Sequence, residues 1–267
     1  MNRVPVRKLT FALAATALAI LLPATASATP SSTMWTPMSL DIQPYGVGHW
    51  GVDNYFTVFR KAEDGAGSFP TDASFTLGVL PGDKLELEIG LDLVEASDYP
   101  VSFNAKLGYA EGGLFAGAPA LQLGIANVGT KSGVTNQDLV YLVVGKSIPN
   151  FGRLSVAPYR GNPDVLVDAK GEKENTGVMV AFDRAFHSVK DTGGTEFNHF
   201  VLAADYASGR NALGGGAVGL YYYFTPNVSL LTGPVWFNEE AINGKMKWTI
   251  QLDVNHPWFG GKQFGGK

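Results

Sequence analysis

The chain has 267 residues and carries 24 acidic against 20 basic side chains, which gives a formal net charge of −4. An acidic chain is a poor partner for nucleic acid or for anionic lipid headgroups, because both are bound through basic patches. It contains no cysteine, so neither disulfides nor thiolate chemistry contribute. The 33 glycines and the 12% aromatic content favour β-structure with many turns.

Residues 1–28 have the organisation of a signal peptide. Basic residues at the start precede an apolar stretch over 9–22, and Ala26-Ser27-Ala28 provides the small residues of a cleavage site. A single membrane anchor is the alternative, although the apolar stretch is short for a span of about 20 residues. The sequence therefore predicts export, with a mature chain that starts at Thr29.

After residue 50, segments of about ten residues alternate apolar and polar side chains, as in 85–93 and 248–255. This period of two indicates strands with one apolar and one polar face. We therefore expect an all-β fold, a transmembrane antiparallel up-and-down β-barrel of about 12 strands within residues 51–259. The expected strands lie near 51–60, 73–80, 83–94, 99–109, 119–128, 137–146, 152–160, 175–184, 199–208, 216–224, 227–237 and 246–255.

The connections between these strands alternate in length. Tight turns at 80–83, 147–150 and 225–227 are separated by longer polar stretches, such as 161–175 and 238–245. Short periplasmic turns and longer external loops are typical of outer-membrane barrels. Two connections break the rule, because 94–99 is short where a long one is expected and 186–198 is long where a short one is expected.

The segment before the first expected strand, residues 29–50, has two interpretations. Its part 39–48 also alternates and would make a thirteenth strand, whereas a bacterial barrel needs an even number. We therefore expect 29–50 either to extend the first strand or to form a periplasmic or lumen-filling segment.

The alternation also predicts which side chains face the barrel interior. A charge on the lipid face near the midplane costs about 2–4 kcal/mol, so charged positions are expected to point inward. The predicted pore-lining residues are Glu86, Glu88, Asp92, Asn104, Lys106, Arg153, Asp183, Asp205, Lys247, Gln251 and Asp253.

Aromatic residues gather at the ends of expected strands, at 221–224, 236–237 and 258–259. Such clusters are typical of the aromatic girdles of a membrane barrel, while core packing in a soluble secreted β-protein is the alternative.

With these features the chain resembles Gram-negative outer-membrane β-barrels that are porin-like. Stretches 35–56, 127–146 and 221–237 resemble a family of small uncharacterised barrels, and this resemblance assigns no functional residue. Such barrels usually end on an aromatic residue, whereas here a tail over 260–267 follows Phe259.

These patterns predict an outer-membrane barrel that acts as a narrow passive channel for small hydrophilic solutes or ions. The acidic interior favours cations. The expected partners are outer-membrane lipid and the solutes, without nucleic acid. A plugged structural or adhesion barrel with partner-binding external loops is the alternative, and a barrel hydrolase is a third, less favoured hypothesis. No enzyme activity, metal or cofactor is expected, because the sequence has neither a nucleophile elbow nor a His-Glu-x-x-His motif. Its four histidines, His49, His187, His199 and His256, lack ligand spacing.

Overall fold

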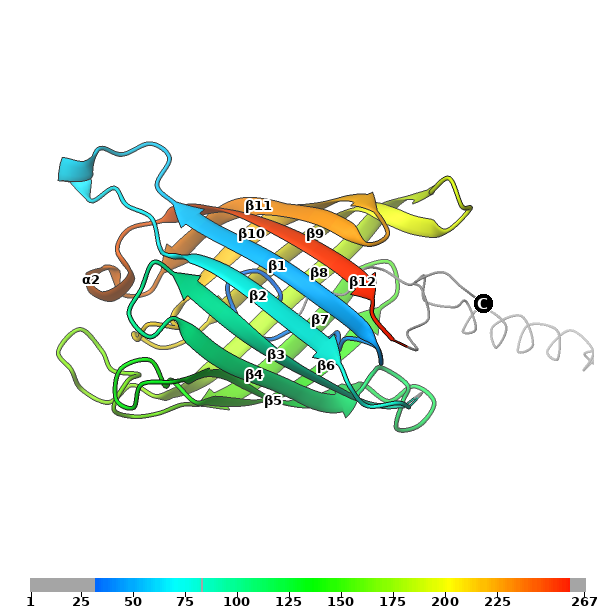
Figure 1. Cartoon of the computed structure of the whole chain (residues 1–267), viewed down its shortest axis with the longest axis horizontal. Helices are drawn as coiled ribbons and strands as arrows, with labels where there is room; N and C mark the ends of the chain where they lie inside the picture. The colour runs from blue at the N-terminus through cyan, green and yellow to red at the C-terminus, as the bar shows by residue number, and fades with distance from the viewer. Residues whose placement is uncertain (1–31, 83, 260–267) are drawn as a thin grey trace, which may run out of the picture.

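A computed structural model describes residues 32–82 and 84–259. In this part of the chain, twelve antiparallel strands form one sheet that closes on itself, because β1 pairs with both β2 and β12 (Figure 1). The predicted all-β, up-and-down barrel is confirmed. The strands are β1 (Val47–Phe56), β2 (Thr71–Gly78), β3 (Leu85–Glu95), β4 (Val101–Tyr109), β5 (Ala120–Gly129), β6 (Leu139–Ile148), β7 (Gly152–Arg160), β8 (Thr176–Lys190), β9 (Glu196–Ala207), β10 (Gly215–Thr225), β11 (Val228–Phe237) and β12 (Lys247–Pro257).

The expected strands match the observed ones closely, with two differences. β1 begins at Val47 rather than at residue 51. β8 continues to Lys190 and pairs there with Glu196, so the long connection expected over 186–198 is an extended hairpin. In Figure 1 this yellow-green hairpin projects beyond the rim of the barrel. The predicted signal peptide, 1–28, and the tail, 260–267, lie outside the described residues.

The two ends of the barrel have different connections. Val47 pairs with Pro257, so both ends of the barrel sequence lie on one rim, here called the terminus side. The turns after β6 and β10 lie on that rim. The opposite rim, the loop side, carries the connections with the short helices η1 (Ala62–Asp64) and α2 (Glu240–Asn243) (Figure 1). The short β3–β4 connection also lies on the loop side.

Alternate side chains of each strand face outward and inward, as the pleat requires. In β3, Ile89, Leu91 and Leu93 are exposed on the outer face, whereas Glu88, directly before Ile89, is only 3% exposed. The outer face is thus mostly apolar, although Arg160 of β7 and Arg184 of β8 are exposed on it, and charged residues such as Glu88, Lys106 and Asp205 are turned inside. No helix in the described part of the chain is long and apolar enough to cross a membrane.

The aromatic run 221–224 is divided between the two faces. Tyr222 and Phe224 lie outside, but Tyr221 and Tyr223 are buried inside the barrel. Because β10 is a regular strand, its consecutive aromatic residues cannot all lie on one face. The expected girdle is therefore formed by only half of this run.

Candidate functional site

The interior of the barrel is occupied by residues 32–46, here called the luminal segment. Its blue trace is visible within the cylinder of strands in Figure 1. Met34, Thr36 and Met38 are each at most 1% exposed. The segment has no strand of its own, apart from one bridge between Tyr45 and Gly78 on the terminus side.

Asp205 on β9 holds the first turn of the luminal segment. Its Oδ2 accepts hydrogen bonds from three consecutive backbone N–H groups, those of Met34, Trp35 and Thr36, at 3.1, 2.9 and 2.7 Å. The hydroxyl of Thr36 donates a fourth bond to the same oxygen, at 2.9 Å. A carboxylate surrounded by successive N–H groups is a strong, charge-assisted arrangement. Asp205 therefore fixes the backbone of this turn almost independently of its side chains.

Further along the segment, charged wall residues make a second set of contacts. Arg153 on β7 donates two hydrogen bonds of 2.7 Å to the carboxylate of Asp41, and its Nε donates to Asp183 at 2.8 Å. Glu88 accepts from the backbone N–H of Gln43 at 2.7 Å and pairs with Lys106 at 3.1 Å. These contacts tie the segment directly to β3 and β7; Lys106 of β4 also donates to the hydroxyl of Ser39 at 2.9 Å, whereas Asp183 of β8 supports the segment only through Arg153.

The lumen wall from β5 to β11 is mostly apolar and packs against the segment, although Gln122, Arg153, Asp183 and Asp205 also face inward from it. Met38 and Leu40 join one buried cluster with Leu139, Tyr141 and Val143 of β6. Met34 joins a second cluster with Ala217 and Leu231. The wall has glycine where the segment comes closest, because a Cβ at Gly145 would lie 2.2 Å from Cδ2 of Leu40. The surface of this wall is therefore complementary in shape to the luminal segment.

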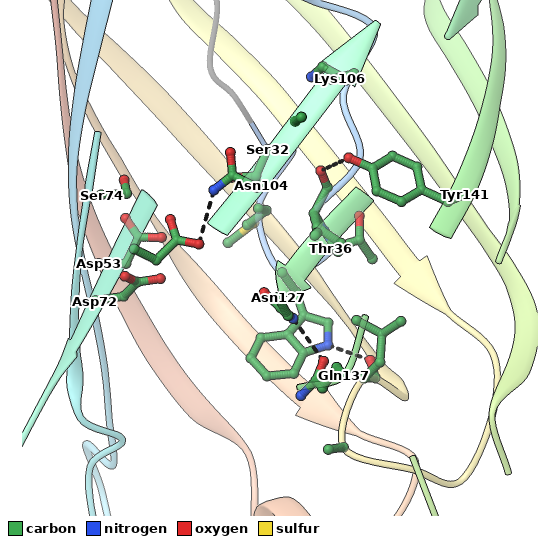
Figure 2. Close-up of a pocket in the computed structure, with 18 of the residues that line it drawn as sticks. Ser32, Thr36, Asp53, Asp72, Ser74, Asn104, Lys106, Asn127, Gln137 and Tyr141 are labelled. Carbon is green, nitrogen blue, oxygen red and sulfur yellow. Dashed lines mark hydrogen bonds between the residues drawn. The ribbon is translucent and has the colours of Figure 1, made fainter. Parts of the chain in front are cut away.

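The opposite wall, from β1 to β4, is polar and borders a cavity of about 250 Å³. Figure 2 shows Asp53, Asp72 and Asn104 on one side of this cavity, and Thr36 and Tyr141 on the other. Asp53 and Asp72 are direct neighbours across β1 and β2. Asp92, next on β3, accepts a hydrogen bond of 3.1 Å from Asn104. Because these residues lie near the loop-side ends of their strands, the cavity occupies the loop-side half of the lumen.

The structure places the predicted pore-lining residues on inward positions but not around one open pore. Glu88 pairs with Lys106, Arg153 with Asp183, and Asp92 with Asn104. Asp205 lies under the segment. Gln251 donates to the carbonyl of Met34 at 2.9 Å. The remaining three are separate: Glu86 is half-buried on β3, Lys247 lies 4.6 Å from the ring centroid of Phe69, and Asp253 lies 3.2 Å from His49.

Sequence reasoning missed two features of this site. The first is Asp53 and Asp72, which complete the acidic wall, although the alternation around them gave the signal. The second is His49, whose ring is 1% exposed and contacts Asp253 and Asn255 inside the barrel, not at the surface or in a girdle. Within residues 32–82 and 84–259, no three His, Asp or Glu side chains are arranged to hold a metal ion.

Comparisons with known proteins give similarity of fold alone. No family model and no curated protein sequence matches the chain. Among solved structures, the COG4313 outer membrane channel from Pseudomonas putida F1 superposes with a TM-score of 0.43 and 11% identity over 83% of this chain and 99% of that chain. The NanC porin gives 0.44 and 10% over 77% and 98%. OmpF of Salmonella typhi, in complex with daunomycin, gives 0.40 and 9% over 79% and 96%.

A closed antiparallel barrel with an apolar outer face and a polar, charged interior is the architecture of outer-membrane barrels. The described chain closes into such a barrel, and its interior combines charged, polar and apolar wall residues. Inside this barrel, the luminal segment lies between a mostly apolar wall and an acidic wall.

Proposed function

We propose that this protein is an outer-membrane barrel that acts as a narrow passive channel for small hydrophilic solutes or ions, with a preference for cations. The observation that carries the proposal is the acid-lined cavity between β1–β4 and the luminal segment. The proposal includes export through a signal peptide at 1–28 and insertion with the apolar face in lipid. The barrel of this proposal spans 51–259, with 29–50 before it and the tail 260–267 after it.

The cation preference follows from the charges around the cavity. Asp53, Asp72 and Asp92 lie on three adjacent strands, and Lys106 is the only lysine or arginine among the residues that line the cavity. Like charges directly opposite each other in a sheet repel, so a cation between Asp53 and Asp72 is favoured. At about 4 Å in water, each carboxylate attracts a monovalent cation by about 1 kcal/mol.

Single-channel recording in a planar bilayer with a KCl gradient tests this proposal. We expect a reversal potential of the sign that cation flow produces, because the cavity attracts cations and repels anions. The triple substitution Asp53→Asn, Asp72→Asn, Asp92→Asn should lower the cation-to-anion permeability ratio about tenfold or more, since 1.4 kcal/mol corresponds to a factor of ten.

The matched control removes three exposed loop carboxylates instead, by Asp64→Asn, Asp98→Asn and Asp164→Asn. This control should keep most of the selectivity. A wild-type protein without conductance would contradict the channel, and an equal loss of selectivity in both triple variants would contradict the role of the cavity.

A plugged structural or adhesion barrel is the second candidate, and the luminal segment is the observation that favours it. In that case the external loops bind a partner and the wild-type protein carries no current. We propose no enzymatic activity, because the buried His49 contacts Asp253 and Asn255 and not a nucleophilic hydroxyl.

A further inference from the structure

We propose that residues 33–43 are the size filter of the channel: they narrow the lumen while docked on Asp205, and their release widens the passage. This inference rests on the proposed channel function and names what sets its solute size. It concerns a part of the chain separate from the acidic wall that selects by charge.

The first support is the position of these residues. They are bonded to wall residues around most of the barrel circumference rather than to one side. The wall partners include Tyr55 of β1, Glu88 of β3, Lys106 of β4, Gln122 of β5, Tyr141 of β6, Arg153 of β7, Asp205 of β9, Tyr221 of β10 and Gln251 of β12. A solute that passes through the lumen therefore has to pass beside this segment.

The second support is the size of the barrel. The interior of an eight-stranded barrel is just filled by its own side chains, whereas barrels of 16–18 strands leave an aqueous channel. A barrel of twelve strands has more space than its wall fills, and here the inward positions of β5–β11 include small residues such as Ala157, Ala203 and Ala217. The segment occupies the space that these small residues leave.

The third support is the kind of contact that holds the segment. Wall glycines lie beneath its apolar side chains, since a Cβ at Gly219 would lie 2.5 Å from Cε of Met34. By contrast, the polar anchors are charged wall side chains such as Asp205 and Arg153 together with neutral ones such as Gln122. When the segment leaves, these charges regain water in the lumen and none stays buried without a partner.

The fourth support is the junction between the luminal segment and β1, where the backbone can change direction. The segment joins β1 at Gly46, which has a left-handed φ of 76° that glycine adopts without strain. The backbone N–H of Gly46 is bonded to Gly78 at 2.8 Å, so the junction remains attached to the rim. Residues 33–43 can therefore leave the lumen while β1 stays paired.

The experiment compares four full-length proteins in planar bilayers and in liposomes swollen with neutral sugars of increasing size. They are the wild type, a deletion of residues 33–43, Asp205→Ala, and the control Asp164→Ala, which removes an exposed carboxylate in the β7–β8 loop. Uncharged sugars report the size of the passage without its charge preference.

We expect the deletion to raise single-channel conductance at least about twofold and to admit larger sugars than the wild type does. Asp205→Ala removes the acceptor of four hydrogen bonds, so the time spent in a wide state should rise about tenfold or more. Asp164→Ala should match the wild type. If the deletion variant does not insert into bilayers, Asp205→Ala alone decides the outcome.

The outcomes separate the two proposals. A conducting wild type with unchanged conductance and sugar cut-off in both variants would overturn the size filter and leave the channel function intact. No conductance in any of the proteins would overturn the channel function itself. A silent wild type with a conducting deletion variant would support the segment as the barrier and would favour the plugged barrel as the resting form.

Discussion

The two walls of the lumen have the same alternating strand pattern but different inward side chains. From β1 to β4 the inward positions are acidic or polar, and they border the cavity. From β5 to β11 most of them are small or apolar and pack against Met34, Met38 and Leu40, apart from the anchors Arg153, Asp183 and Asp205. The comparison shows that a polar interior is not required all around a barrel, because a segment of the chain can cover one wall.

The same comparison explains where the luminal segment turns its side chains. Its methionines and Leu40 face the apolar wall, whereas its backbone N–H groups and Asp41 meet the charged residues. The cavity that remains lies along the acidic wall.

Met38→Asp should have the largest effect. Met38 is fully buried against the apolar wall, and an unpaired charge at such a site costs about 3–5 kcal/mol. The segment is expected to leave this wall, which lowers thermal stability in detergent and raises conductance. Met38→Leu, which nearly conserves volume, is the matched control and should cost less than about 1.5 kcal/mol. Equal behaviour of both variants would show that the segment does not depend on the apolar wall.

Val180→Lys tests the outer face, which both walls share. Val180 lies on the outer surface of β8 opposite Val156, the middle residue of β7, and a lysine near the bilayer midplane costs about 2–4 kcal/mol. Urea unfolding from lipid vesicles measures this loss, with Val180→Leu as the control. An unchanged free energy of unfolding would mean that this face does not lie in lipid.

Asp72→Asn should slightly stabilise the barrel. It removes one of two carboxylates that face each other across β1 and β2, and like charges at such positions destabilise by about 0.2–1 kcal/mol. The effect should be largest at low salt, because salt screens the repulsion. A loss of stability on this substitution would show that Asp72 is held by a partner of opposite charge.

Glu111→Gln should have the smallest effect, since Glu111 lies in the β4–β5 connection outside the lumen. Burial by itself raises the pKa of this carboxyl, but hydrogen bonds from Ser147 and the charge of Lys146 hold it below its ordinary value of 4.5. A lowered pKa means stability that is present above 4.5 and is lost as the pH falls through the lowered value.

The measurement for Glu111→Gln is thermal unfolding at several pH values. Because both partners are partly exposed, the variant should lose only a few tenths of a kcal/mol at neutral pH. The difference from the wild type should disappear in acid. A difference that persists at the lowest pH would contradict the ion pair as its cause.

The strands and their sidedness could be predicted from sequence, because a period of two is a local signal that repeats in each strand. The inward positions of Glu88, Lys106 and Gln251 followed from the same signal. The apolar wall was missed for a physical reason. Leu139, Tyr141 and Val143 lie in a run that is apolar on both faces. Such a run does not show which residues face the lumen, because apolar residues belong on the inner face only if an apolar segment fills the lumen.

Lumen filling was one of the interpretations that the sequence offered for residues 29–50, but the individual contacts that dock the luminal segment could not be predicted from it. The contact of Thr36 with Asp205 joins residues that are 169 positions apart. Nothing in the short segment 32–46 marks its backbone N–H groups as partners of a distant carboxylate. For the same reason the position of His49 beside Asp253 was not foreseen, since it depends on closure of the barrel between β1 and β12.

Cysteine accessibility tests the asymmetry of the two walls most directly, because the chain has no cysteine of its own. Ser74→Cys places a thiol at the acid-lined cavity, and Ala157→Cys places one on the fully buried apolar wall. A cationic methanethiosulfonate reagent, applied to the protein in liposomes, should modify Ser74→Cys rapidly and change its conductance, and it should leave Ala157→Cys unmodified. Equal modification of both positions would contradict a lumen that is open along one wall and filled along the other.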